Sequence, residues 1–400
     1  MKILVWNIQF FTSARISTTA QNDLDRVEAN LAYILSTIQQ AAPDIFVVIE
    51  PRSNQGDVGG LARGNGPIGL VKLYAKMLGK FGSTSWNLVP PLRLNARDIH
   101  SSNTYTECVG VFWRNEVLEF TGPWVWTAAG ARAPGEHTVA AAYPEPWNRL
   151  VPDDVTASGQ ASFYSATGEI HFPAEANRRP FLCTFRERGG THRHLKVFAM
   201  HTSPSTARDA CARMLGVNEL APNDNEISVL TGDFNLDLNS TNTAEQATLS
   251  AFALLTDLRV VRPPQVSGAY PGTLLCERPA ANWTNYQRAL SLDYAFVGYG
   301  ANARIPGTFQ PAVEVVNRVA GTPTPPFSVH MSTTLEQYRA IELLTQMQRG
   351  VDPTDATNMT LDLFRQRWNY GHIAQPRRTA PTAEEPGDGT SDHLPILVTV

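Results

Sequence analysis

The sequence predicts a layered α/β fold, and three stretches near the N-terminus indicate it. Lys2–Gln9 is an apolar run of strand length, Asp23–Ala41 repeats apolar residues at helical spacing, and Ile45–Ile49 is a second apolar run. Asn22 is a candidate N-cap of the helix and Pro43 its stop. A strand, a helix and a strand in this order form the basic unit of layered α/β proteins, and such a unit brings the ends of its strands close together.

The rest of the chain continues to alternate strands with helices. Two segments, 120–176 and 298–389, are longer than this alternation requires, and we expect them to be elaborations of one domain that spans residues 1–400. The further strands are expected at Thr104–Arg114, Phe181–Arg186, Leu195–His201, the start of Glu226–Asp237, and the end of Trp283–Val297. The further helices are expected at about Ile68–Lys80, from Pro204 to about Leu220, near Ala244–Leu255, at Thr334–Gln348 and around Leu361–Trp368.

Composition argues against two classes of protein. No stretch approaches the roughly twenty apolar residues that a membrane-spanning helix needs, and the formal net charge of -4 argues against a surface coated in positive charge for binding nucleic acid. One local segment differs, because Asn177–Lys196 carries six basic residues and one acidic residue. Two interpretations stay open for this segment, a solvated hairpin and a face that contacts phosphate.

The cysteines and the N-terminus bear on the compartment. Cys108, Cys183, Cys211 and Cys276 have no spacing typical of a metal site, so we expect buried free thiols and a reducing compartment. Met1 leads directly into the first strand without a signal peptide, which favours a cytoplasmic protein. A secreted protein whose leader had been replaced by a starting Met would begin in the same way.

Polar side chains lie at the ends of five apolar strands, either directly after the strand or directly before it. The stretch Glu226–Asp237 shows this most clearly, because its apolar run stops at Gly232 and continues with Asp233 and Asn235. The same layout occurs at Asn7, at Glu50, at Asp293, and at Ser391, Asp392 and His393. A single acid at a strand end is usually a solvated cap. Five together predict one common centre whose oxygen atoms suit a hard divalent cation or a phosphate.

These motifs together resemble the endonuclease/exonuclease/phosphatase superfamily, the deoxyribonuclease I-like metal-dependent phosphoesterases. The resemblance implies a four-layer α/β/β/α sandwich, with two packed mixed sheets flanked by helices, and it covers the chain from end to end. The motifs that carry it are WNI at Trp6–Ile8, VVIE ending at Glu50, GDFN at Gly232–Asn235, LDYAFV at Leu292–Val297 and SDHLP at Ser391–Pro395.

The resemblance implies a metal site and a general base. Glu50 is expected to bind Mg²⁺ directly, with Asn7 and Asp392 beside it, and Mn²⁺ or Ca²⁺ are the alternative ions. His393, oriented by Asp293, is expected to act as the base.

It also implies a second histidine and contacts to substrate. His201 begins an HTSP turn and is expected to pair with Glu107, acting as the acid or as a phosphate clamp. Tyr105, two residues before Glu107, is expected to line the scissile phosphate, and Arg179, before Pro180, to approach a substrate phosphate. Asp233 is expected to polarise the attacking water or to hold a second metal, and Asn235 to donate to a phosphate oxygen.

The function that the resemblance implies is a Mg²⁺-dependent phosphodiesterase, specifically an endonuclease that nicks DNA, with DNA favoured over RNA. A phosphatase or phosphodiesterase for inositol phosphates or phospholipids is the alternative within the same fold. A catalytically silent binding module is the third possibility, and it is disfavoured because every expected polar position is filled.

Overall fold

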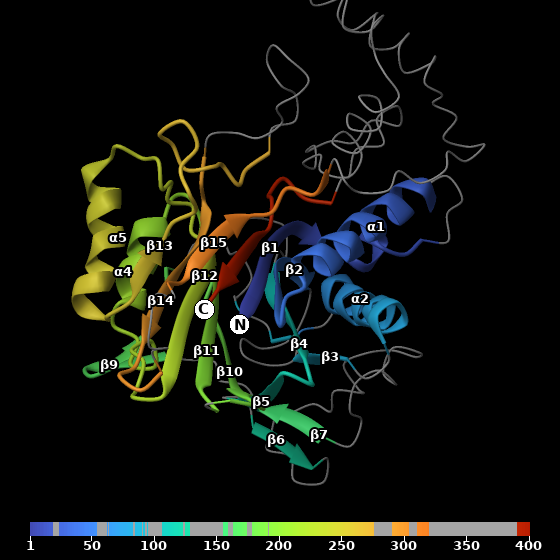
Figure 1. The fold of residues 1–400 in the computed structure, drawn as a ribbon, viewed down its shortest axis with the longest axis horizontal. Coiled ribbons are helices and arrows are strands. Elements are labelled where there is room, and N and C mark those ends of the chain that lie inside the picture. Colours follow the sequence, from blue (N-terminus) through green and yellow to red (C-terminus); the bar gives the residue numbers. More distant parts are fainter. Residues whose placement is uncertain are drawn as a thin grey trace, which may run out of the picture.

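Two six-stranded sheets pack face to face in the computed structural model, and helices cover their outer faces (Figure 1). The structure describes residues 1–18, 24–53, 62, 64–82, 85–89, 91–92, 94, 106–122, 125–128, 155–158, 163–173, 178–190, 192–275, 290–303, 310–319 and 390–400.

The first sheet contains both ends of the chain and has the strand order β15-β16-β1-β2-β4-β3. Only β1 and β2 are parallel neighbours in it, because the helix α1 (Leu24–Ala41) carries the chain from one to the other. The strand–helix–strand unit expected at the N-terminus is therefore present. The strands of this sheet are β1 (Lys2–Phe11), β2 (Ile45–Ser53), β3 (Trp86–Val89), β4 (Thr106–Arg114), β15 (Ala312–Val315) and β16 (Ile396–Thr399).

The second sheet has the strand order β13-β14-β12-β11-β10-β5. Its single parallel pair is β11 with β12, which the helix α4 (Ala207–Met214) connects. The strands of this sheet are β5 (Leu118–Gly122), β10 (Phe181–Glu187), β11 (His194–His201), β12 (Glu226–Asp233), β13 (Arg259–Val261) and β14 (Asp293–Tyr299). Two short antiparallel pairs lie between β5 and β10 in sequence: β6 (Val125–Ala128) with β7 (Val155–Ser158), and β8 (Phe163–Ser165) with β9 (Gly168–Ile170).

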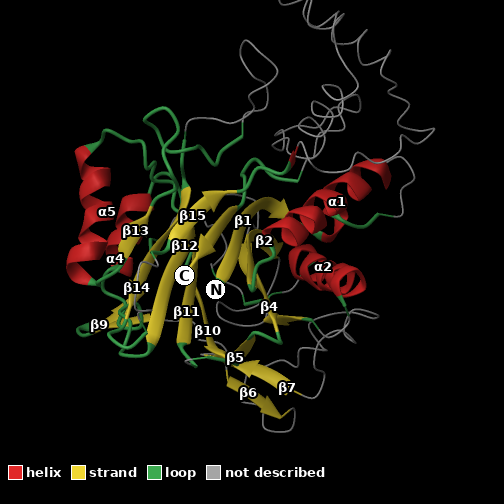
Figure 2. Cartoon of the chain, viewed as in Figure 1, coloured by secondary structure: helices red, strands yellow, loops and turns green. Residues whose placement is uncertain are grey.

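Alternation along the strands explains the layers. On β11, Val197 and Ala199 belong to the core that contains the first sheet, whereas Phe198 and Met200 belong to a second core with α4 and α5 (Thr243–Leu255). The helices α1 and α2 (Asn65–Phe81) cover the opposite side of the molecule (Figure 2). The resulting order is helices, sheet, sheet, helices, which confirms the predicted four-layer sandwich.

Some expected elements end earlier or lie elsewhere. The helix expected from Pro204 to about Leu220 is only α4, because the chain turns after it through bonds from Gly216 N to Arg213 O and from Val217 N to Met214 O. The two helices expected at Thr334–Gln348 and Leu361–Trp368 lie outside the described residues, as does most of the segments 120–176 and 298–389. The single-domain reading of residues 1–400 stays a prediction.

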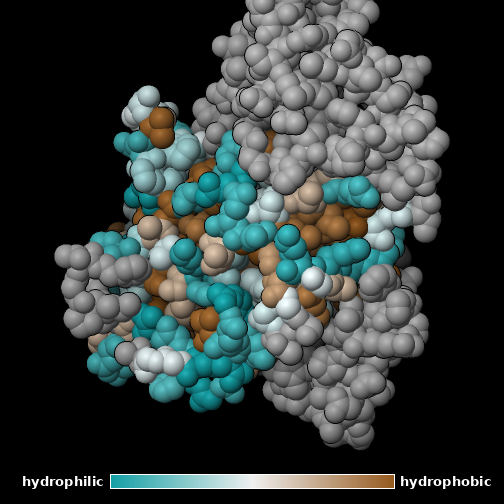
Figure 3. Space-filling view, turned by 45° about the vertical axis from the view of Figure 1, so that its right-hand side comes forward, coloured by the Kyte–Doolittle hydropathy of each residue, from teal (hydrophilic) through white to brown (hydrophobic). Residues whose placement is uncertain are grey.

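The surface, the cysteines and the hydropathy of the helices can be compared with the expectations from the sequence. Hydrophilic and hydrophobic residues are mixed over the described surface in Figure 3. Cys108, Cys183 and Cys211 are buried free thiols, and Cys276 lies outside the described part of the chain. Among the described helices, none has the length and hydropathy required to cross a membrane.

Candidate active site

Strand register brings the predicted polar residues to one edge of the second sheet. His201 is the register partner of Asp233 in the parallel β11–β12 pair, and Asp233 is the partner of Asp293 in the antiparallel β12–β14 pair. The three residues therefore form one row across three strands. Asn7 of β1 in the first sheet donates from Nδ2 to Asp233 Oδ2 at 3.0 Å, so the row lies where the two sheets meet.

Gly232 allows β12 to place Asp233 in this row. Its φ is +144°, and a Cβ added there would lie 1.9 Å from Met200 O on the neighbouring strand. Any larger residue would push the two strands apart at the point where their ends carry the catalytic candidates.

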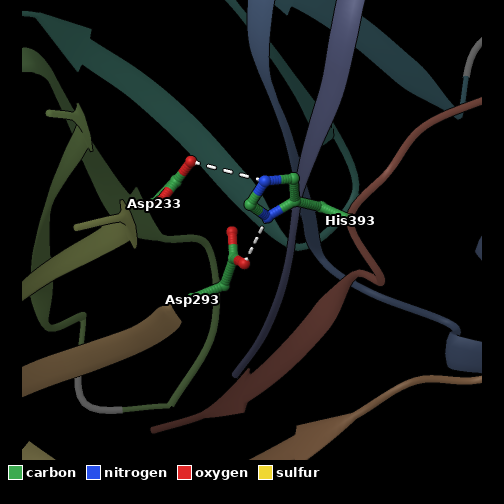
Figure 4. A group of neighbouring side chains, drawn as sticks. All are labelled: Asp233, Asp293 and His393. Atoms are coloured by element: carbon green, nitrogen blue, oxygen red, sulfur yellow. Dashed lines mark hydrogen bonds and ion pairs between the residues drawn. The ribbon is translucent and has the colours of Figure 1, made fainter. Parts of the chain in front are cut away.

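His393 and Asp293 form the first histidine–carboxylate pair (Figure 4). His393 Nδ1 donates to Asp293 Oδ2 at 2.7 Å, and its Nε2 lies 3.6 Å from Asp233 Oδ2. Burial disfavours the charged imidazole, but Asp293 and Asp233 favour it more strongly and raise the pKa of His393 well above its usual value. Burial also raises the pKa of Asp293, yet its oxygen accepts the short bond from Nδ1, so we assign the proton to His393.

His201 and Glu107 form the second pair, on the other side of Asp233. His201 Nδ1 donates to Glu107 Oε2 at 3.0 Å, and its Nε2 lies 3.6 Å from Asp233 Oδ2. Glu107 comes from β4 of the first sheet and is only 1% exposed, so the pair bridges the sheets. Burial and Arg178 lower the pKa of His201, whereas Glu107 and Glu50 raise it, and the net shift is upward.

Arg178 reaches this pair from the segment just before β10. Its Nη2 lies 2.8 Å from Glu107 Oε1, and its Nη1 lies 3.0 Å from His201 Nε2. An arginine only donates, so Nε2 of His201 accepts here and the ring carries its proton on Nδ1. The sequence predicts Arg179 as the arginine near substrate phosphate, and this stays a prediction. The structure adds its neighbour Arg178, which contacts both His201 and Glu107.

Three other basic residues of the 177–196 segment each pair with an acid: Arg186 with Glu119, Arg193 with Glu187, and Lys196 with Glu226. The charge of each of these three residues is offset by an acid, whereas Arg178 contacts two of the catalytic candidates. Both interpretations of the segment stay predictions.

The residues expected to bind metal lie at the same edge and fit a hard cation. Asn7 Oδ1 and Asp392 Oδ1 are buried and, within the described part of the chain, have no hydrogen-bond partner. Buried oxygen atoms of this kind are costly unless a cation or water satisfies them. Burial raises the pKa of Glu50, with Glu107 and Asp392 adding to the rise and His201 opposing it, and such a concentration of carboxylates also favours a bound cation.

Asp233, Asp293 and His393 offer a second grouping for a metal, because their ligand atoms lie within 4.8 Å of one another. The short bond between His393 Nδ1 and Asp293 Oδ2 already occupies two of these atoms. We therefore favour Asn7, Glu50 and Asp392 as the ligands, while Asp233 borders both groupings.

Asn235 lies next to the two pairs in a left-handed backbone conformation, with a φ of +48°. Its backbone N donates to Asp233 Oδ1 at 3.1 Å, and its side-chain Nδ2 donates to Thr202 O at 2.8 Å. Tyr105, the other residue expected near the phosphate, lies outside the described residues.

Several residues behind the site, to which the sequence analysis assigns no role, fix its loops. Ser391 Oγ donates to Asn7 O and accepts from His393 N, which ties the C-terminal motif to β1. Gln9 Nε2 donates to Asp392 Oδ2 at 3.0 Å. Thr273 Oγ1 accepts from Asp293 N at 3.1 Å. The position of Ser391 inside the SDHLP motif was a usable signal, whereas nothing in the sequence around Thr273 pointed to the site.

Several solved structures are similar to this chain at low sequence identity. An endonuclease/exonuclease/phosphatase family protein of Bacteroides thetaiotaomicron is 12% identical, with 100% of this chain and 96% of that chain covered and a TM-score of 0.42. A mannosyl-6-phosphatase of the same organism is 12% identical, with coverages of 100% and 98% and a TM-score of 0.41. TDP2 of D. rerio, complexed with a single-strand DNA product, is 11% identical, with coverages of 100% and 97% and a TM-score of 0.38. These similarities are too low to bear on activity.

The search of curated proteins gives no match to this chain. The family model described as the Endonuclease/Exonuclease/phosphatase family matches residues 4–328, which is most of the sequence. The chain therefore belongs to the endonuclease/exonuclease/phosphatase family, whose members are phosphoester hydrolases that generally depend on a divalent metal.

Proposed function

We propose that this protein is a Mg²⁺-dependent phosphodiesterase that nicks DNA. The observation that carries the proposal is the symmetry about Asp233. Two histidines, each held by its own carboxylate, present Nε2 to the same Asp233 oxygen at 3.6 Å. Hydrolysis of a phosphodiester needs one group that takes a proton from water and another that gives a proton to the leaving oxygen, and this arrangement supplies both.

The bonds of each histidine suggest its role. Because Asp293 holds Nδ1 of His393, Nε2 of that ring is the atom that takes the proton from the attacking water. The water oxygen then bonds to phosphorus while the bond from phosphorus to the ester oxygen breaks. His201 can give a proton to that leaving oxygen from its own Nε2 only after Arg178 has moved off this atom and Nε2 has taken up a proton from solvent. Glu107, which accepts from Nδ1, stabilises the doubly protonated ring that then acts as the acid.

Substrate contacts come from Arg178 and Asn235. Arg178 is 17% exposed in its side chain, so its guanidinium reaches the edge of the site, where a phosphate oxygen can replace the Nε2 contact. The amide nitrogen of Asn235 carries a second hydrogen beside the one donated to Thr202 O, and it is available to another phosphate oxygen.

Asn7, Glu50 and Asp392 would hold the cation. Mg²⁺ at these ligands supplies charge neutralisation on the phosphoryl oxygens, and Mn²⁺ or Ca²⁺ are the alternative ions. The charge of Asp392 helps to raise the pKa of His393. A cation bound to Asp392 would offset this charge, so metal binding favours the form of His393 whose Nε2 is unprotonated.

Incubation with supercoiled plasmid tests the proposal. Metal-dependent nicking is expected from the wild type and from His194→Ala, and loss of nicking from His201→Ala. His194 is a matched control, because it is an exposed histidine at the opposite end of the same strand. Release of phosphate from inositol phosphates or phospholipids without nicking would instead favour the alternative function. If the wild type shows neither nicking nor phosphate release, that result contradicts the proposal that the protein is an enzyme.

A further inference from the structure

Thr202 follows His201 and connects several candidates of the site. It is 2% exposed, its N donates to Asp233 O at 3.0 Å, and its Oγ1 donates to Phe234 O. Its carbonyl oxygen accepts two bonds, from Asn235 Nδ2 at 2.8 Å and from Arg178 Nη1 at 3.0 Å. The backbone carbonyl of Thr202 therefore contacts both of the side chains that we assign to substrate phosphate, and its hydroxyl holds the carbonyl of the residue before Asn235.

The Thr202 carbonyl fixes the direction of the Asn235 amide. A carbonyl oxygen can only accept, so the nitrogen end of the amide must face it. The second N–H of that nitrogen is then directed by the same contact. Arg178 donates to the same oxygen. The side chains of Arg178 and Asn235 are therefore both held by the carbonyl oxygen of Thr202, the residue after His201.

The Thr202 hydroxyl stabilises the backbone that carries Asn235. The peptide between Phe234 and Asn235 is held on both sides: its carbonyl accepts from Thr202 Oγ1, and its N–H donates to Asp233 Oδ1 at 3.1 Å. Asn235 has a φ of +48°, a conformation that costs a non-glycine residue free energy and needs support from its surroundings. Without the hydroxyl, one side of this peptide is released where strain is stored.

We propose that Thr202 is a positioning residue that sets the geometry of the phosphate contacts made by Arg178 and Asn235. The inference rests on the proposed function, since it assigns both of these side chains to the substrate. Thr202 touches neither substrate nor metal in this scheme and acts through its hydroxyl and its carbonyl.

Two substitutions at Thr202 separate positioning from general stability. Thr202→Val keeps the branched shape and removes the hydroxyl, whereas Thr202→Ser keeps the hydroxyl. Thr231→Val is the matched control, because Thr231 is also fully buried on β12 and its hydroxyl donates to a strand carbonyl, Tyr294 O, at 3.0 Å. Steady-state hydrolysis of bis(p-nitrophenyl) phosphate with Mg²⁺ gives kcat and KM, and inorganic phosphate gives an inhibition constant.

For Thr202→Val we expect kcat/KM to fall about 10- to 100-fold, as for other residues that orient a direct ligand. KM and the phosphate inhibition constant should both rise, and Thr202→Ser and Thr231→Val should stay within about threefold of the wild type. Partial unfolding alone would lower the apparent kcat and leave KM unchanged. A Thr202→Val protein with a lower kcat and an unchanged KM, or one with the kcat and KM of the wild type, would overturn the proposal.

The crystal structure of Thr202→Val keeps this test separate from the proposed function. If the wild type hydrolyses no phosphodiester, the proposed function is wrong, but the positioning can still be read from coordinates. Movement of Asn235 Nδ2 and Arg178 Nη1 away from the carbonyl oxygen of residue 202 would support it. Retention of both contacts in the variant would overturn it.

Discussion

Glu107→Gln tests the second histidine–carboxylate pair directly. Glu107 serves two partners at once, because Oε2 accepts from His201 Nδ1 at 3.0 Å and Oε1 lies 2.8 Å from Arg178 Nη2. Glutamine has the same shape but only one oxygen, so its amide nitrogen must face either His201 or Arg178, both of which donate. The variant can therefore keep one of these two contacts.

The lost contact sets the size of the effect. A hydrogen bond to a charged group contributes about 1.5–3 kcal/mol, and about 1.4 kcal/mol corresponds to a tenfold change. The kcat/KM of Glu107→Gln should therefore fall about 10- to 150-fold. Burial and Arg178 lower the pKa of His201 and Glu107 raises it, so removing the carboxylate charge moves the alkaline limb of the activity profile to lower pH.

The assay is hydrolysis of bis(p-nitrophenyl) phosphate over a range of pH, with thermal unfolding as a check on the fold. Glu119→Gln is the matched control, since Glu119 pairs with Arg186 at an exposed position on β5 and should leave kcat/KM unchanged. A Glu107→Gln protein that is folded, has a kcat/KM within about threefold of the wild type and an unshifted profile would refute the role of the pair.

Three further predictions concern the metal, the backbone and a remote ion pair. EDTA should abolish hydrolysis and added Mg²⁺ should restore it, and activity that survives chelation would contradict the metal site. Gly232→Ala should lower the free energy of unfolding by about 3 kcal/mol or more, because its Cβ meets Met200 O and φ is +144°; a loss in urea denaturation under about 1 kcal/mol would contradict the required close approach. Burial raises the pKa of Glu187, but its bonds with Arg193 lower it by more, so the stabilisation is complete above the unfolded pKa of about 4.3 and is lost as pH falls through the lower folded value. Glu187→Gln should therefore cost about 2 kcal/mol at neutral pH and less in acid, and a difference independent of pH would contradict this account.

The sequence indicates the polar residues at the strand ends, but few of the hydrogen bonds that connect them. Asp233, Asp293 and His393 were visible because each follows or precedes an apolar run, and strand register then makes neighbours of the first two. The pairing of His201 with Glu107 came from family resemblance, since no pattern within the sequence relates residues 94 positions apart.

Other parts could not be predicted for physical reasons. The segment 178–180 is not a strand, so alternation of faces could not decide between Arg178 and Arg179. The helix after Pro204 was expected to continue, but hydrogen-bonded turns end it at Met214. The links made by Thr202 depend on contacts between loops far apart in the sequence, and composition and periodicity carry no information about such contacts.

Crystals soaked in Mn²⁺ give the most direct test of the central claim that residues from both sheets build one metal-dependent phosphodiesterase centre. Anomalous scattering locates the ion without assumptions about activity. We predict a peak at coordination distance from Asn7 Oδ1 and Asp392 Oδ1, with Glu50 as a third protein ligand and hydrolysis lost when the ion is removed. A Mn²⁺ ion bound only elsewhere, or an undiminished activity without any ion between these residues, would contradict the account.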